Sequence, residues 1–387
     1  MMTNRVTLRD VAAKAGVHHT TASRALKNDP RISARTVATI KALAGQMGYM
    51  PDPMLSSLNT YRIASRRSQY HGTVAWLTNF PTRDGWRSSC YTLYFQGAAE
   101  QLLQHGYRLE EFWLQEPGMS ARRSSQVLLH RGIRGLMICP LPANRGHLSL
   151  AWDKFSAVSF GYSLVRPKLH LFSAAHYRAV ITCMRNLRAL GYQRIGMVTS
   201  HEMNERMERM WTAAYRAELP ILPHSEEIPI HLYPDPVLHA PAAKGKDAKS
   251  LLLQWYREHR PEAIVSSTTP VTPWLMEEGY QVPEEVAVVS ASLHEEDLVG
   301  GVVEASREIG RAAANFLVGM LQRGEYGIPA IPQRTLLEGH WYAGKSVAKG
   351  TKSKPAKAPA KTPAPARTPK APKAPKASKA ATPKSKK

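Results

Sequence analysis

The first fifty residues combine short stretches of helical periodicity with turn residues. A helix over 8–15 is predicted by apolar side chains spaced i, i+3, i+4 and i+7, with Thr7 as its cap and Gly16 as the turn that ends it. A second helix follows over 19–26, and Ser33 can cap a third. Helices joined by a short glycine turn are typical of modules that set one helix in the major groove of DNA.

A short connecting region follows this helical module. Asp52 and Pro53 predict the start of one more short helix, and the basic and polar residues of 61–71 have the composition of a solvated linker. We therefore assign an all-α helix-turn-helix domain with a hinge helix to 1–60, and a linker to 61–71.

From Gly72 onward the pattern changes to short buried strands alternating with amphipathic helices. Strands are predicted at 73–77, 109–114, 136–139, 157–160, 195–199, 263–266 and 286–289. The helices between them include 91–105, 176–190 and 306–323. Strands separated by helices of this length imply right-handed βαβ units and parallel sheets covered on both faces. Because a stretch of roughly 275 residues exceeds one compact core, the sequence predicts a two-lobed α/β core over 72–346.

The end of the chain has a different composition. The segment 347–387 is rich in Lys, Ala and Pro and contains no aromatic or acidic residue. Such a segment cannot bury enough apolar surface to offset the entropy of ordering, so a disordered basic tail is predicted.

The net charge of +22 is concentrated at the two ends of the chain. Residues 1–70 carry +8, residues 348–387 carry +13, and the middle carries +1. A nearly neutral body between two basic ends favours a polyanionic partner for those ends, and double-stranded DNA is the first candidate.

Several classes of protein are disfavoured by what the sequence lacks. No stretch approaches the ~18 uninterrupted apolar residues of a membrane helix, and the first ten residues contain no apolar run of signal-peptide length. The three cysteines lie far apart without metal-site spacing, which argues against a disulfide framework or a structural zinc site and fits a reducing compartment. We expect neither a metal nor a cofactor, and we expect a cytoplasmic location. No nucleotide-binding, zinc-protease or serine-hydrolase motif is present, which argues against an enzyme and leaves no catalytic residue to name.

The segment VTLRDVAAKAGVHHTTASRAL resembles the opening of the lactose/galactose repressor (LacI/GalR) family of transcriptional regulators. The likeness continues through Ile32-Ser33-x-x-Thr36 and Gly48-Tyr49-x-Pro51 with the spacing intact. The resemblance implies that the chain to about Ser346 forms a ligand-binding core similar to periplasmic sugar-binding proteins. The tail lies outside the part of the chain that this resemblance covers.

This resemblance assigns DNA contacts residue by residue. His19, Thr20 and Arg24 are expected to face base edges from the recognition helix, and an arginine there can donate two hydrogen bonds to guanine. Residues expected to touch phosphates or to position the helices are Leu8, Ser23, Ser33, Thr36 and Tyr49.

Leu58 matches the family's hinge-helix leucine, which wedges between base pairs in the minor groove, with a role in core packing as the alternative. The sequence departs from the family pattern at two places. His18 stands where a capping Ser is usual, and Ser56-Ser57 precede Leu58 where an Arg is common. These departures leave the operator sequence open.

In a two-lobed α/β core, ligands bind where the carboxyl ends of the strands face each other across the cleft. The candidates at these ends are Asn79, Arg83, Trp86, Arg206, Arg209, Thr268 and Ser292. For Trp86, core packing is the simpler interpretation.

Family members that bind sugars or purines carry acidic or amide residues at several of these points. This chain instead has Ala175, Thr268-Thr269 and Ser292-Leu293. The sequence therefore leaves open whether the effector is sugar-related, and whether one exists.

We expect a sequence-specific transcriptional regulator, with repression as its expected mode, whose operator affinity responds to a small molecule held between the lobes. A homodimer on a near-palindromic operator is expected because one such module reads too few base pairs. The alternative is a nucleoid-associated protein that binds DNA broadly through its basic tail and has no effector.

Overall fold

The computed structural model describes residues 6–26, 28–29, 31–49, 72–87, 90–220, 227–234, 248–267, 270–296 and 298–348 of the 387-residue chain. The hinge helix and the linker predicted above lie outside these residues, as does the predicted tail from residue 349 onward, whereas Val347 is buried in the core.

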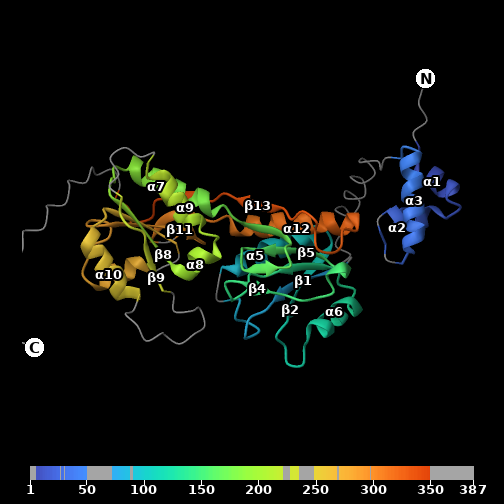
Figure 1. Ribbon diagram of the computed structural model, residues 1–387, viewed down its shortest axis with the longest axis horizontal. Coiled ribbons are helices and arrows are strands. Elements are labelled where there is room, and N and C mark those ends of the chain that lie inside the picture. Colours follow the sequence, from blue (N-terminus) through green and yellow to red (C-terminus); the bar gives the residue numbers. More distant parts are fainter. Residues whose placement is uncertain are drawn as a thin grey trace, which may run out of the picture. The chain divides into compact units, whose positions relative to one another are not determined.

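Three short helices form the N-terminal module: α1 (Leu8–Lys14), α2 (His19–Leu26) and α3 (Ala34–Gln46) (Figure 1). α1 begins with a capping box, in which the Thr7 hydroxyl accepts the Asp10 N–H at 3.4 Å and the Asp10 carboxylate accepts the Thr7 N–H at 2.8 Å. Gly16 ends the turn after α1 with φ +64°, a conformation that glycine adopts without strain. The module has its own small core of Val11, Ala12, Ala22, Ala25, Ile40 and Ala44. The predicted helix-turn-helix is confirmed.

The first lobe of the core contains a six-stranded parallel sheet in the order β13-β7-β5-β3-β1-β2. Its strands are β1 (Gly72–Thr78), β2 (Tyr107–Trp113), β3 (Gly135–Ile138), β5 (Ser156–Phe160), β7 (His170–Ala174) and β13 (Arg334–Leu337). A small ladder pairs β4 (Gly146–His147) with β6 (Leu164–Arg166), and a short 3-10 helix, η1 (Trp152–Lys154), precedes β5.

Helices cover both faces of this sheet. α5 (Tyr91–Gln104) and α12 (Ser306–Arg323) lie side by side on one face, and α6 (Ala121–His130) covers the other (Figure 1). Successive strand residues point to opposite faces, so Trp76 of β1 packs with α5 and α12 whereas Leu77 packs with Leu128 of α6.

The second lobe has a six-stranded sheet in the order β14-β12-β11-β10-β8-β9, parallel except where β12 meets β14. Its strands are β8 (Ile195–Ser200), β9 (His231–Tyr233), β10 (Ala263–Ser266), β11 (Ala287–Leu293), β12 (Gly300–Val303) and β14 (His340–Tyr342). Its helices are α7 (His176–Ala189) and α9 (Met210–Glu218) on one face, α10 (Ala248–His259) and α11 (Val271–Glu277) on the other, and α8 (His201–Arg206) directly after β8.

The chain crosses between the lobes where β7 leads into α7, where β12 leads into α12, and where β13 leads into β14. The ends of β7 and β12 therefore lie at the junction of the lobes. Both lobes and their parallel sheets confirm the predicted two-lobed α/β core.

All the predicted strands form, and β10 and α12 have the predicted bounds. Strands β7 and β12, the short strands β4, β6 and β9, and the two strands that close the sheets, β13 and β14, were not predicted. β11 also extends beyond its predicted end, because its pairing with β12 continues past Ser290 through a bulge as far as Leu293. Ser292 is therefore a residue of β11 itself, three positions beyond the end that was predicted for this strand.

Candidate functional site

The outer face of α2 presents the side chains that the sequence assigned to DNA bases. Ala22 and Ala25 are fully buried against the other two helices, whereas His19, Thr20 and Arg24 are exposed. A helix with one face in the core and three polar side chains on the other has the form of a recognition helix.

His18, which departs from the family pattern, lies directly before α2. The His18 carbonyl accepts the N–H groups of Thr21 at 2.9 Å and Ala22 at 3.1 Å, so His18 starts α2 as a capping residue does. Its Nδ1 lies 2.9 Å from the Thr20 hydroxyl. The imidazole therefore orients one of the side chains expected to face base edges.

Arg24 lies close to an acidic side chain, Asp29. Its Nε lies 4.0 Å from the Asp29 carboxylate, and its side chain is 52% exposed. The same carboxylate accepts two hydrogen bonds from the Arg31 guanidinium, at 2.9 and 2.6 Å, which lower the pKa of Asp29 to about 2. Asp29 is therefore ionised at neutral pH and lies within ion-pair distance of the exposed Arg24 side chain.

The residues expected to contact phosphates are divided between exposed and packed positions. Ser33 caps α3 through the Thr36 N–H at 3.2 Å, and the two hydroxyls lie 2.7 Å apart. Leu8 and Tyr49 pack against the module core, and Ser23 is partly buried. Leu58 lies outside the described residues.

A cavity of about 380 Å³ lies between the two lobes. Its wall is mainly aromatic and apolar, with contributions from Tyr91, Tyr94, Tyr162, Trp211, Tyr233 and Trp274. A cavity of this size is large enough for a small organic ligand.

Arg206 lines this cavity but already has partners. It comes from α8 of the second lobe, and its guanidinium donates to the Leu141 carbonyl of the first lobe at 2.9 Å and to the Tyr91 hydroxyl at 3.2 Å. Longer contacts at 3.5 Å reach two further carbonyls of the first lobe. Arg206 therefore joins the lobes across the cleft.

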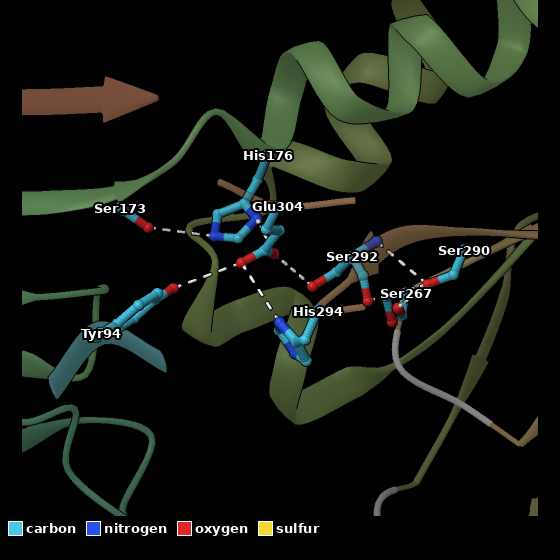
Figure 2. A network of polar contacts seen from close by, with 8 residues as sticks. All are labelled: Tyr94, Ser173, His176, Ser267, Ser290, Ser292, His294 and Glu304. Atoms are coloured by element: carbon cyan, nitrogen blue, oxygen red, sulfur yellow. Dashed lines mark hydrogen bonds and ion pairs between the residues drawn. The ribbon is translucent and has the colours of Figure 1, made fainter. Parts of the chain in front are cut away.

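The polar centre of the cavity is a carboxylate that was not among the predicted site residues. Glu304 precedes α12 at a crossing between the lobes, and its side chain is 3% exposed. Figure 2 shows it surrounded by hydroxyl and imidazole groups: Ser292 donates to it at 2.5 Å, and the Tyr94 hydroxyl of the first lobe lies at 3.5 Å.

Two imidazoles face the same carboxylate. Nδ1 of His176 lies 3.8 Å from Oε1 of Glu304, and Nδ1 of His294 lies 3.8 Å from Oε2 (Figure 2). Burial lowers the pKa of His176, more than the nearby Glu304 raises it, so this imidazole is neutral at neutral pH. Its Nε2 lies 3.3 Å from the Ser173 hydroxyl.

The predicted ligand residues do not all gather at the cavity. Arg206 and Ser292 line it. Trp86 is fully buried among the aromatic side chains of the first lobe, Asn79 accepts a hydrogen bond from Gln115 at 2.7 Å, and Arg83 is exposed. None of these three lines the cavity, and neither does Arg209, which donates to Glu205 at 2.6 Å. Thr268 lies outside the described residues.

The cavity wall also includes a cysteine, Cys90. Burial, together with the charge of Glu304, raises the pKa of Cys90 to about 12, so this thiol stays protonated and is a poor nucleophile. The described residues contain no cluster of three or more side chains placed to hold a metal ion. In the same part of the chain, no helix has the length and apolar character to cross a membrane.

A helix-turn-helix module joined in one chain to a two-lobed α/β core with a central cavity defines a class of ligand-binding regulators. Comparisons with known proteins agree. Residues 7–52 match the model for bacterial regulatory proteins of the lacI family, and residues 184–347 match the periplasmic binding protein-like domain. Together with the similarity to curated regulators, these two matches support a regulator of the LacI/GalR family.

Two curated relatives match parts of the chain. The HTH-type transcriptional regulator PtxS of Pseudomonas plecoglossicida is 26% identical over 225 residues, covering 56% of this chain and 60% of that protein. The HTH-type protein ExuR of Bacillus subtilis is 47% identical over 53 residues, covering 14% of this chain and 16% of that protein. The chain thus spans less than two thirds of the length of either relative.

Two solved structures share the fold. The transcriptional regulator CelR in complex with cellobiose is 20% identical with a TM-score of 0.51, covering 88% of this chain and 100% of that chain. A LacI-family regulator protein from Rhizobium etli is 15% identical with a TM-score of 0.54, covering 71% of this chain and 99% of that chain. At these identities the likeness concerns the fold.

Proposed function

We propose that this protein is a sequence-specific transcriptional regulator, acting as a repressor, that binds a near-palindromic operator as a homodimer in the cytoplasm. The observation that carries the proposal is the outer face of α2, where His19, Thr20 and Arg24 are exposed while Ala22 and Ala25 anchor the helix. A small molecule in the cavity between the lobes sets the operator affinity. The family and the names of the similar regulators support both parts.

The DNA-binding part is tested by selecting a preferred duplex from a random library with the full-length protein. Affinities for that duplex and for random DNA are then measured for the wild type and Arg24→Ala. A bidentate arginine contributes about 1–3 kcal/mol of base discrimination, so the variant should lose about tenfold or more of the preference for the selected duplex.

Arg35→Ala is the matched control, because it removes the same charge from an exposed position on α3. Its loss of affinity should be the same for both duplexes, as expected for phosphate attraction alone. If Arg24→Ala behaves like Arg35→Ala, or if no preferred duplex emerges, sequence-specific recognition by α2 is refuted. Broad binding through the basic tail is then the better account.

A further inference from the structure

Around Glu304 the cavity presents buried imidazole nitrogens that no residue of the described chain pairs, and the Trp211 Nε1–H is a further unpaired group, a donor, on its wall. We assign the His176 proton to Nε2, where it can be donated to Ser173, which leaves Nδ1 as an acceptor. That Nδ1 and the Nδ1 of His294 are both buried, and neither forms a hydrogen bond with any residue that the structure describes. Each faces the Glu304 carboxylate at 3.8 Å, beyond hydrogen-bond distance.

The Glu304 carboxylate also has no cationic partner in the described part of the chain. Its contacts are with the hydroxyls of Ser292 and Tyr94 and with the two imidazoles. Arg206, the arginine that lines the same cavity, uses its guanidinium on main-chain carbonyls and Tyr91. A buried carboxylate without a cation is costly, and a ligand that supplies one is correspondingly favoured.

The rest of the wall favours a flat apolar body. Trp211 and Trp274 line the cavity beside four tyrosines, and Met203 and Met207 add further apolar surface. Aromatic faces attract cations as well as apolar rings. A sugar, in contrast, presents a hydroxyl on most of its carbons and requires several polar side chains that are free to pair with them.

We infer that the cavity binds an amine with an aromatic or similarly flat apolar body, its ammonium group placed between Glu304, His176 and His294. An ammonium has three donors and no acceptor, which matches a carboxylate flanked by the Nδ1 acceptor of His176 and by the Nδ1 of His294, which accepts when its proton is on Nε2. The inference rests on the effector site of the proposed function and names the chemical class of its ligand.

The test uses isothermal titration calorimetry on the full chain at pH 7 with two sets of isosteric probes. The first set is phenethylamine, 2-phenylethanol and phenylacetate, and the second is tryptamine, tryptophol and indole-3-acetate. Within each set the aromatic body stays the same, and the terminal group is a cation, a neutral hydroxyl or an anion. Loss of a charge-assisted hydrogen bond should weaken binding about tenfold or more, so at least one amine should bind that much more tightly than its alcohol and its acid.

Glu304→Gln should abolish this preference for the amine. Glu338→Gln is the matched control, because it makes the same substitution at an exposed residue beside another crossing between the lobes. The wild-type comparison of isosteres stands even if Glu304→Gln fails to fold. The inference is overturned if neither amine binds more tightly than its alcohol and its acid, or if cellobiose binds more tightly than both amines.

Failure of this inference is distinguishable from failure of the proposed function. Affinity for the selected duplex is measured separately, with and without the amine. If the protein prefers its duplex but binds neither amine more tightly than the matching alcohol and acid, the ligand class is refuted and DNA recognition is not affected. A protein that binds an amine through Glu304 without a preferred duplex supports the ligand class and refutes sequence-specific recognition.

Discussion

Replacement of Gly310 by Ala tests how closely two helices of the first lobe depend on each other. α5 and α12 make the most extensive helix contact in the described core, and Gly310 lies where their backbones meet. A Cβ at this position would lie 2.1 Å from the Tyr94 carbonyl oxygen and 2.8 Å from the Ala98 nitrogen. These are main-chain atoms of α5, so the helices must move apart by more than an ångström to restore van der Waals contact.

The expected cost follows from two opposing effects. Forcing extra volume into a packed contact costs about 1–3 kcal/mol, whereas replacing glycine by alanine within a helix gains about 0.5–1 kcal/mol. Gly310→Ala should therefore lower the free energy of unfolding by about 1–2 kcal/mol. Because α5 carries Tyr94 and Glu304 precedes α12, the same movement should separate the two side chains at the cavity.

Urea unfolding followed by circular dichroism measures the first effect, with Gly319→Ala as the control on the same helix. A Cβ at Gly319 would meet only the flexible end of Arg323, at 2.9 Å, so this variant should be neutral or more stable than the wild type. Equal unfolding free energies for the two variants would refute the argument that backbone contact at Gly310 fixes the helix spacing.

Further predictions concern the other charged contacts and the tail. Asp29 has a pKa of about 2, below its ordinary value of 3.8, so its stabilisation is present above pH 4 and lost as the pH falls through 2. Asp29→Asn should therefore lower the stability of the helical module by roughly 1 kcal/mol at pH 7. In thermal unfolding, the difference in stability between the variant and the wild type should shrink between pH 4 and pH 2, and a difference independent of pH would contradict this. The ion pair between Arg334 and Glu208 joins the lobes at 2.7 Å, but both side chains are about half exposed. Arg334→Ala should therefore lower the free energy of urea unfolding by less than about 1 kcal/mol, and a much larger loss would contradict this expectation. Deletion of 348–387 should flatten the plot of log affinity for random DNA against log salt by about 0.9 for each phosphate that the tail neutralises, and identical slopes would mean that the tail does not touch DNA.

The parts of the fold that the sequence predicted are those determined by local signals. The bounds of α2 and α12 follow from apolar spacing and turn residues within a few positions of each helix end. β12 was missed because its Gly300-Gly301 pair has the composition of a turn. The structure shows why glycines stand there: a Cβ at Gly301 would lie 1.9 Å from the Ser290 carbonyl oxygen of the neighbouring strand.

The centre of the candidate site was missed for a related reason. Glu304 follows β12 directly, so overlooking that strand concealed a carboxylate at its carboxyl end. His176 lies more than a hundred positions earlier in the chain and meets Glu304 only because β7 and β12 both end at the junction of the lobes. The only sequence signal for Glu304 is a single acidic residue after a short apolar run. Trp86 is the opposite case, a predicted site residue that lies in the core, because the sequence alone does not distinguish a cavity wall from a core for an aromatic residue after a strand.

The position of Glu304 limits how strongly a ligand can act on DNA binding. It lies at one crossing between the lobes and His176 at another, so a ligand held by both, and by Tyr94 of the first lobe, favours one arrangement of the lobes. A ligand shifts such an equilibrium only by its difference in affinity for the two arrangements. One charge-assisted contact supplies about 1.5–3 kcal/mol, whereas moving a population from 1:99 to 99:1 needs about 5.5 kcal/mol. An amine held by Glu304 alone should therefore change operator affinity by about tenfold to a hundredfold, and by reciprocity the operator should change amine affinity by the same factor.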